Sequence, residues 1–323
     1  MHDKLKVMAC IILSREDDYS ADLVYFWLLK NGSLPFRINI NRPFSIKATK
    51  NDYRIIDNKS KKEVEVSKIR SAYCMSGQVF DISQLSASTV REQTLRINKN
   101  EQYKFICYLL GQIPSLRLVG QLNYSEFNFN KLTVLKSAQE VNLQVPLNAV
   151  VTSKKQLWEL KEKWFNIIGK NIDLSLEIFT NDYFSLGQRT IEFTSKMIEE
   201  LPDEFGITYI QQAIQKEFEI RSIFFADHFY SIAIFPNSSN DIDWRGIHAC
   251  DNFRMVPYQL PNIIENRLRI LCHRLGLNYG AIDIIKATSG EYVFLEVNPY
   301  GQYGFVSKIG NYYLEKKIAG YLK

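Results

Sequence analysis

A short segment near the C-terminus carries acidic and amide side chains at a spacing that suits metal binding. Residues 292–299 alternate in the manner of a strand, which places Phe294, Glu296 and Asn298 on one face. Asp283 lies in the apolar run before this segment, and the intervening Thr-Ser-Gly sequence favours a turn. We therefore expect an antiparallel hairpin in which Asp283 lies opposite Glu296.

Two carboxylates that face each other across a hairpin repel, and burying both is costly unless a cation is present. Mg²⁺ prefers oxygen ligands, and the carbonyl of Asn298 beside the two carboxylates meets that preference. The functional interpretation is a magnesium site that also holds nucleotide phosphates. The alternative is a half-exposed hairpin whose Glu296 and Asn298 face water, and spacing alone does not choose between the two.

Basic side chains upstream are suited to hold an anion. Glu219 and Arg221 share one face of a predicted strand, where Arg221 offers a planar guanidinium to a phosphate or carboxylate. Glu219 can accept hydrogen bonds from ribose hydroxyls. Arg245 follows a tryptophan, and a second guanidinium near Arg221 would clamp a carboxylate. The alternatives are a surface ion pair for the first two residues and a solvated loop for Arg245.

The elements that must position these side chains fall into two regions. The chain begins with a strand, a helix and a second strand, a start typical of a parallel, doubly wound sheet. The region ends with a charged hairpin and a long helix. The expected ranges are strands at 5–13 and 36–40, helices at 21–30 and 91–110, and the hairpin at 52–68.

Strand patterns dominate the later part of the second region. Expected helices cover 131–141, 154–163 and 261–275, and expected strands cover 166–170, 209–214, 219–225, 229–235 and 280–287. Residues 190–201 fit either a helix or a flap. Because no linker-like sequence separates the two regions, their boundary near residue 120 is placed by pattern alone.

Composition excludes several classes of protein. The 323 residues are 46% hydrophobic and 13% aromatic, which is enough for two or three packed domains. A net charge of +5 is small for this length and does not indicate a nucleic-acid partner. No apolar run approaches the roughly 18 residues of a membrane span. Five scattered cysteines and four separated histidines favour reduced thiols, a cytoplasmic location and no zinc site.

Taken in order, these segments resemble the ATP-grasp superfamily and, within it, the graspetide synthetases that mature microviridin- and plesiocin-like peptides. The grasp-with-spasm maturases are the most similar branch. The most specific part is Phe-Leu-Glu-Val-Asn-Pro-Tyr-Gly-Gln at 294–302, with an Asp thirteen residues before its Glu. The resemblance covers most of the chain and is also carried by residues 12–20, 36–39, 130–131, 211–221, 242–245, 254–261, 278–283 and 311–319.

The resemblance implies an α/β fold with α+β lobes. A doubly wound pre-ATP-grasp domain would occupy residues 1–120, and a two-lobed ATP-grasp domain residues 121–323. Its central lobe would cover 121–208 and its C-terminal lobe 209–323. The resemblance also implies ATP and two Mg²⁺ ions as cofactors, and a homodimer.

The resemblance further implies a role for each site residue that matches a family motif. Lys131 and Lys170 match the lysines that reach the nucleotide phosphates. The hinge whose backbone reads adenine is matched by Gln211, Gln212, Ala213 and Ile214. The ribose acceptor is matched by Glu219, and the phosphate-side arginine by Arg221. Asp283, Glu296 and Asn298 match the magnesium ligands. Arg221 and Arg245 match the arginine pair that receives the acidic side chain of the peptide.

The implied reaction is phosphorylation of an Asp or Glu side chain of a ribosomal precursor peptide, followed by attack of a Thr or Ser hydroxyl or a Lys amine. The product is a macrocyclic ω-ester or amide, and the partner is a peptide with a leader and an acidic, Thr-rich core. Leader recognition is expected at residues 171–202 or in the N-terminal domain. Two alternatives stay open: a ligase adding free amino acids to a protein or small acid, and an inactive peptide-binding module.

Overall fold

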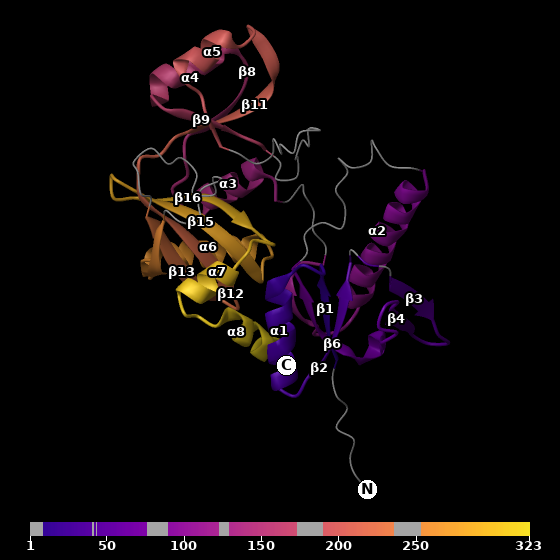
Figure 1. Ribbon diagram of the computed structural model, residues 1–323. Helices are drawn as coiled ribbons and strands as arrows, with labels where there is room; N and C mark the ends of the chain where they lie inside the picture. The colour runs from indigo at the N-terminus through magenta and orange to yellow at the C-terminus, as the bar shows by residue number, and fades with distance from the viewer. Residues whose placement is uncertain are drawn as a thin grey trace.

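The computed structural model describes residues 9–40, 42, 44–75, 90–122, 129–172, 190–235 and 253–323. These residues form four sheets. They are arranged as an N-terminal domain, a central lobe and a C-terminal lobe (Figure 1). The N-terminal domain lies beside the C-terminal lobe, and the central lobe lies beyond the opposite end of that lobe.

The N-terminal domain is built on a four-stranded sheet in which every pairing is parallel. Its order is β2 (Leu34–Asn39), β1 (Ala9–Ser14), β6 (Ile69–Cys74) and β7 (Arg117–Gly120). Helix α1 (Tyr19–Lys30) packs on one face and α2 (Val90–Gly111) on the other. The predicted doubly wound start is therefore confirmed. A small antiparallel sheet of β3 (Phe44–Ala48), β4 (Tyr53–Asp57) and β5 (Glu63–Glu65) leads through a 3-10 turn, η1 (Val66–Lys68), into β6.

The central lobe is a four-stranded antiparallel sheet with its own small core. Its order is β10 (Ile191–Glu192), β9 (Ile167–Lys170), β11 (Glu204–Gln212) and β8 (Asn148–Ser153). Two helices, α4 (Lys154–Trp164) and α5 (Ser195–Glu200), contribute Leu157, Trp164 and Ile198 to this core. The stretch for which the sequence allowed a helix or a flap thus contains the short strand β10 and the short helix α5.

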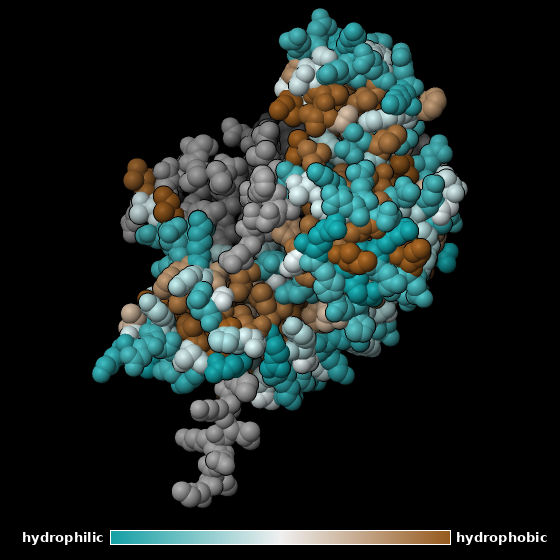
Figure 2. Space-filling view, turned by 180° about the vertical axis from the view of Figure 1, so that it is seen from behind, coloured by the Kyte–Doolittle hydropathy of each residue, from teal (hydrophilic) through white to brown (hydrophobic). Residues whose placement is uncertain are grey.

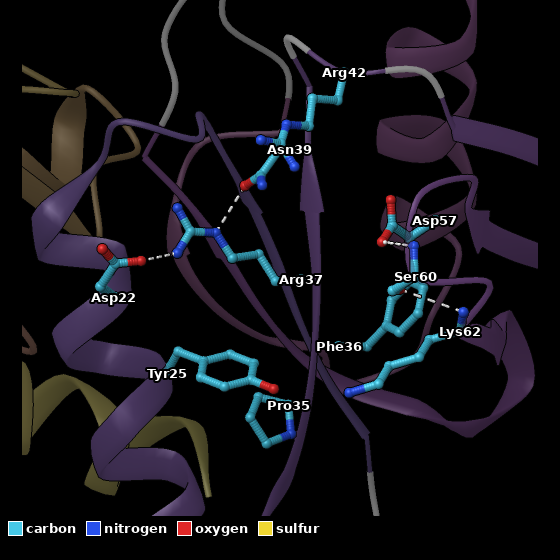
Figure 3. A pocket seen from close by; sticks show the side chains of 10 residues that line it. All are labelled: Asp22, Tyr25, Pro35, Phe36, Arg37, Asn39, Arg42, Asp57, Ser60 and Lys62. Carbon is cyan, nitrogen blue, oxygen red and sulfur yellow. Dashed lines mark hydrogen bonds and ion pairs between the residues drawn. The ribbon is translucent and has the colours of Figure 1, made fainter.

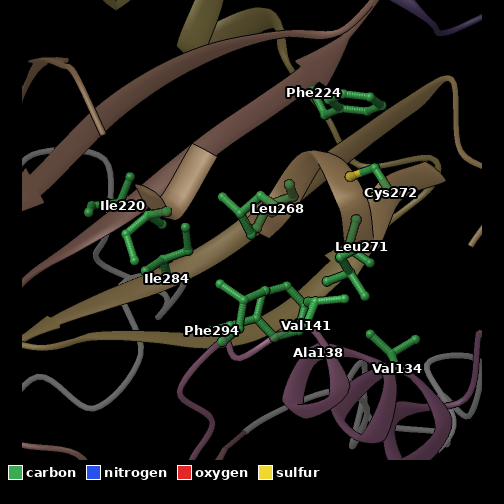
Figure 4. Packing of buried hydrophobic residues seen from close by; sticks show 14 of the residues in the cluster. Val134, Ala138, Val141, Ile220, Phe224, Leu268, Leu271, Cys272, Ile284 and Phe294 are labelled. Carbon is green, nitrogen blue, oxygen red and sulfur yellow. The ribbon is translucent and has the colours of Figure 1, made fainter. Parts of the chain in front are cut away.

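The C-terminal lobe is a five-stranded antiparallel sheet. Its order is β14 (Arg254–Tyr258), β13 (His228–Phe235), β12 (Lys216–Phe225), β15 (Tyr279–Ala287) and β16 (Tyr292–Asn298). Helices α3 (Lys131–Glu140) and α6 (Asn262–Arg274) cover one face. Figure 4 shows this core, with Ile220, Ile284 and Phe294 of the sheet directed toward α3 and α6. Although α3 precedes the central lobe in the chain, it therefore packs against the C-terminal sheet.

Two helices cover part of the opposite face of the C-terminal sheet. Helices α7 (Gly304–Ile309) and α8 (Leu314–Leu322) lie between this face and the N-terminal domain, and the apolar side chains of all three parts form one core (Figure 1). The side chain of Asn278 adds two hydrogen bonds across the boundary: it accepts from Gly120 N at 3.1 Å and donates to Leu118 O at 3.0 Å. The N-terminal domain and the C-terminal lobe thus share a continuous interior.

No helix in the described ranges is long and apolar enough to cross a membrane. Within the same ranges Cys10, Cys74, Cys107 and Cys272 are buried free thiols, as expected from their apolar surroundings. Cys250 lies outside the described residues.

Candidate active site

The hairpin of β15 and β16 has the predicted register at the two acids. Asp283 pairs directly with Glu296, but Ile284 then pairs with Phe294, so Leu295 is the extra residue of a β-bulge. Phe294 consequently joins Val297 in the core under α3 and α6, while Glu296 faces the other way. The expectation that Phe294 shares a face with Glu296 and Asn298 is therefore wrong, because the bulge breaks the strict alternation of the strand.

A buried ion pair joins β12 to β15. The strand register places Arg221 opposite Asp283, and its Nη1 donates to both carboxylate oxygens at 2.7 and 2.8 Å. Arg221 is 7% exposed and Asp283 is 5% exposed. The sequence allowed a surface ion pair of Arg221 with Glu219. In the structure Arg221 instead pairs with Asp283, in the interior. Among the described residues, Arg221 Nε is buried without a hydrogen-bond partner, so this N–H can still donate to a ligand.

A second ion pair links α3 to β16. Asn130 caps the helix by accepting a hydrogen bond from Thr133 N, which places Lys131 in the first turn. A cation at this end of a helix meets the positive end of the helix dipole, so a nearby anion is needed to offset the repulsion. Glu296 supplies it: Lys131 Nζ donates to Glu296 Oε2 at 3.2 Å, and the lysine side chain is 8% exposed.

The turn after β16 positions the third predicted magnesium ligand. Asn298 Oδ1 accepts a hydrogen bond from Tyr300 N at 2.9 Å, and the hydroxyl of Tyr279 donates to Gly301 O at 2.5 Å. A methyl group on Gly301 would lie 2.8 Å from Arg221 Nη2, so only glycine lets the turn pack this closely against the guanidinium. Sequence reasoning did not single out Tyr279 or Gly301, although Gly301 lies within the most specific motif.

The residues assigned to the nucleotide lie where the central lobe joins the C-terminal lobe. Lys170 ends β9, Gln211 and Gln212 end β11, and Ala213 and Ile214 lead into β12. The amide of Gln212 donates to Leu147 O at 2.8 Å and that of Ala213 to Asn166 O at 2.9 Å. These two amides are therefore already engaged. Recognition of adenine by this hinge stays a prediction, and it would use the carbonyl groups and side chains of residues 211–214 and the amide of Ile214.

Glu219 has a basic neighbour that the sequence did not indicate as functional. Lys216, three residues earlier on β12, donates to Glu219 Oε1, and both side chains are largely buried. Glu219 lies on the same face of β12 as Arg221. A ribose hydroxyl bound there would meet a carboxylate whose orientation Lys216 already fixes.

The structure thus brings together Arg221, Asp283, Glu296 and Lys131 through one buried and one partly buried ion pair, with Asn298 two residues along the strand from Glu296. Within the described ranges no three His, Cys, Asp or Glu residues gather as a metal cluster. The predicted set contains two carboxylates and one amide, a donor set that suits a hard cation which also binds phosphate oxygens. Arg245 lies outside the described residues.

A cavity of about 710 Å³ adjoins the turn after β16. One wall is the loop between β1 and α1, where Asp18 caps the helix by accepting from Ala21 N. The other wall is the turn that begins two residues after Asn298. The lining residues are Arg15, Asp17, Asp18, Tyr19, Ser20, Tyr73, Met75, Tyr300, Gly301, Gln302, Tyr303, Gly304 and Phe305. The cavity therefore opens between the N-terminal domain and the part of the C-terminal lobe that carries the candidate site.

A smaller hollow of about 320 Å³ lies within the N-terminal domain (Figure 3). Several of its charged side chains have partners: Arg37 pairs with Asp22 and donates to Asn39 Oδ1 at 2.8 Å, and Arg42 pairs with Glu16. Asp57 accepts hydrogen bonds from the backbone of its own turn. We assign no chemistry to this hollow.

Two comparisons found no relatives: no protein-family model matches the chain, and no curated protein matches it. Solved structures do match along almost the whole length. The macrocyclase MdnC from Microcystis aeruginosa MRC, bound with its precursor peptide MdnA, has a TM-score of 0.79 at 20% identity, covering 98% of this chain and 99% of that chain.

A Chryseobacterium gregarium RiPP-associated ATP-grasp ligase, in complex with ADP and a leader and core peptide, has a TM-score of 0.80 at 20% identity, covering 98% of this chain and 96% of that chain. The ATP-grasp ligase PsnB with a precursor variant, Mg and ADP reaches 0.74 at 13% identity, covering 98% and 97%. This chain has the ATP-grasp fold. The fold class expected from the sequence is confirmed.

The charges of the candidate site balance within the protein. Lys131 and Arg221 offset Glu296 and Asp283, so the charges of these four groups sum to zero. The two basic groups lie against the same two carboxylates that the sequence assigned to magnesium. A metal ion bound to these carboxylates would therefore take over the neutralisation that Arg221 and Lys131 now provide.

Proposed function

We propose that this protein is an ADP-forming ligase that crosslinks side chains of a ribosomal precursor peptide. The observation that carries the proposal is the convergence of Arg221, Asp283, Glu296 and Lys131 in one buried and one partly buried ion pair. The ATP-grasp fold supports it, because the structures that share this fold include ligases bound to precursor peptides.

The reaction has two steps. The γ-phosphoryl group of ATP is transferred to a carboxylate oxygen of a peptide Asp or Glu, which gives an acyl phosphate and ADP. A Thr or Ser hydroxyl, or a Lys amine, of the same peptide then attacks the carboxyl carbon. Phosphate leaves, the nucleophile gives up its proton, and an ω-ester or amide ring closes. No protein nucleophile is required, so catalysis depends on positioning and on neutralising charge.

Magnesium fits the oxygen donors of Asp283, Glu296 and Asn298. We propose that two ions bind, the number that the family resemblance implies. Bound there, Mg²⁺ would neutralise charge on the transferring phosphate. When the nucleotide is bound, Lys131 and Arg221 can turn from the carboxylates to phosphate oxygens. We assign Lys170 to the phosphates as well, Glu219 to the ribose, and the segment from Gln211 through Ile214 to adenine.

The peptide carboxylate needs a cationic binding site beside the γ-phosphate. Arg221 is suited to this role. Its buried Nε–H has no acceptor among the described residues, so it can donate a hydrogen bond to the peptide carboxylate. Arg245 is proposed as the second guanidinium of the pair. The cavity of about 710 Å³ beside Gly301 is the space that we assign to the peptide core, because it reaches the turn against which Arg221 packs.

The leader of the peptide needs a separate docking surface. Figure 2 shows hydrophobic side chains exposed over the central lobe. Within the range expected to recognise the leader, Ile191 is 48% exposed and Met197 39% exposed. We propose this side of the central lobe for the leader. We also propose a cytoplasmic location, which the cysteine pattern favours, and a homodimer, which the resemblance implies.

Mass spectrometry of a precursor peptide tests the function. Short reading frames next to the gene that encode repeated Thr and Glu or Asp residues supply the candidate peptides. With protein, ATP and Mg²⁺, a crosslinked peptide loses one water per ring, whereas a ligase for free amino acids would add the mass of a residue and consume free Glu. An inactive binding module would leave the peptide and ATP unchanged.

Two variants sharpen this test. Glu296→Gln should abolish turnover, because it removes a carboxylate charge from the proposed metal site. Glu63→Gln, on the exposed face of a hairpin in the N-terminal domain, is the matched control and should keep full activity. Full ATP-dependent activity of Glu296→Gln would rule out the metal assignment.

A further inference from the structure

Strand β11 carries two buried polar atoms that find no hydrogen-bond partner among the described residues. Tyr209 and Gln211 are each 1% exposed. Within the described part of the chain, the hydroxyl of Tyr209 and Oε1 of Gln211 have no hydrogen-bond partner. Because the two residues are two positions apart on a strand, they share a face of the sheet. A buried polar atom without a partner is destabilising, so a row of two calls for an explanation.

The surroundings of the Tyr209 hydroxyl are those of the proposed ATP site. Tyr209 pairs directly with Lys170 across β9 and β11, so both side chains lie on the same face. Its ring belongs to the same buried apolar cluster as Phe129, two residues before Lys131. Glu296 is near enough for its charge to act on the phenol. The hydroxyl is therefore placed among the groups assigned to the phosphates and to magnesium.

The chemistry of the hydroxyl favours a phosphate oxygen as its partner. A phenol is protonated at neutral pH and donates one hydrogen bond. Glu296 already accepts from Lys131. Lys170, on the same face, is itself assigned to the nucleotide phosphates. A phosphate oxygen bound between these groups would give the hydroxyl an acceptor that the described residues do not provide.

We propose that Tyr209 is a further nucleotide-binding residue whose hydroxyl donates a hydrogen bond to a phosphate oxygen of ATP. The inference rests on the proposed function, since it takes ATP as the ligand. It assigns to Tyr209 a binding role that neither the motifs nor the resemblance indicated. Gln211, which we assign to adenine, lies on the same face of β11.

Tyr209→Phe is the substitution that isolates this hydroxyl, because the ring and its packing are kept. A hydrogen bond to a charged group is worth enough to change affinity about tenfold or more. We expect the dissociation constant of Mg·ATP, measured by calorimetric titration, to rise by about this factor. The dissociation constant of adenosine should not change. The nucleotide-free variant should melt at or above the wild-type temperature, because an unsatisfied buried hydroxyl is removed.

Tyr312→Phe is the matched control, since the Tyr312 hydroxyl donates to Ser231 O at 2.6 Å, away from the site. It should melt below the wild-type protein and bind Mg·ATP normally. Equal affinities of wild-type and Tyr209→Phe for Mg·ATP would overturn the inference, as would equal weakening of ATP and adenosine. If the wild-type protein itself fails to bind Mg·ATP, the proposed function falls as well. The two failures are thus distinguishable.

Discussion

Replacing Arg221 by methionine tests whether its guanidinium neutralises Asp283 at the position where a magnesium ion would otherwise do so. The substitution keeps a long side chain but removes the guanidinium that donates to both oxygens of Asp283. Breaking a buried ion pair from one side costs about 3–5 kcal/mol. Because Asp283 takes part in further interactions, the lower end of that range is expected. At about 2 °C per kcal/mol, the melting temperature should fall by about 6 °C.

Thermal unfolding should be followed with a chelator present and again with excess Mg²⁺. If Asp283 and Glu296 bind magnesium, the ion replaces the lost positive charge and recovers part of the melting temperature of Arg221→Met. The wild-type protein should respond less, because its carboxylates are already neutralised. Arg274→Met removes an exposed pair with Glu140 and serves as the control, with little change in either condition.

A double variant separates charge from packing. Arg221→Met combined with Asp283→Asn leaves neither charge buried, so it should recover most of the stability that the single variant loses. Wild-type melting of Arg221→Met would refute the assigned energetics of the pair. Equal stabilisation of wild type and variant by Mg²⁺ would refute the claim that the guanidinium and the metal ion occupy the same electrostatic position.

Gly301→Ala should lower turnover at least about tenfold, because the new methyl would lie 2.3 Å from Ala281 Cβ and 2.8 Å from Arg221 Nη2. Gly206→Ala, with open space around its methyl, should stay active in the same assay. Burial raises the pKa of Cys10 and Cys107 to about 11. Since these thiols ionise earlier in the unfolded chain, melting temperatures should fall from about pH 9 to 11. A flat profile would contradict this. Arg245→Ala should bind Mg·ATP normally yet fail to modify peptide, and loss of both would argue against a substrate clamp.

The hairpin of the site shows how far local pattern reaches. The apolar run around Asp283 and the turn before β16 were enough to predict that Asp283 lies opposite Glu296, and the register confirms it. The bulge at Leu295 was not predictable, because alternation treats every residue of a strand alike. Phe294 and Glu296 are two positions apart and read as one face, yet the extra residue turns Phe294 into the core.

The basic partners of Asp283 and Glu296 could not be predicted from local sequence patterns, for a different reason. Arg221 meets Asp283 only because β12 lies next to β15, and this strand order depends on how the whole sheet is assembled. Lys131 meets Glu296 because α3 packs against the C-terminal sheet although it precedes the central lobe in the chain. Both acids were identified from their own segments, whereas the cations that neutralise them come from distant ones.

The order of charged and apolar residues along β12 nevertheless explains where the site lies. On the face of β12 that carries the site, Glu219 and Arg221 come first and Ile223 and Phe225 follow. The apolar pair packs in the core shared with α7, α8 and the N-terminal domain. Covering the charged pair with the same helices would bury charge under apolar side chains. The helices therefore stop before Arg221, which the turn at Gly301 covers instead and which Asp283 neutralises.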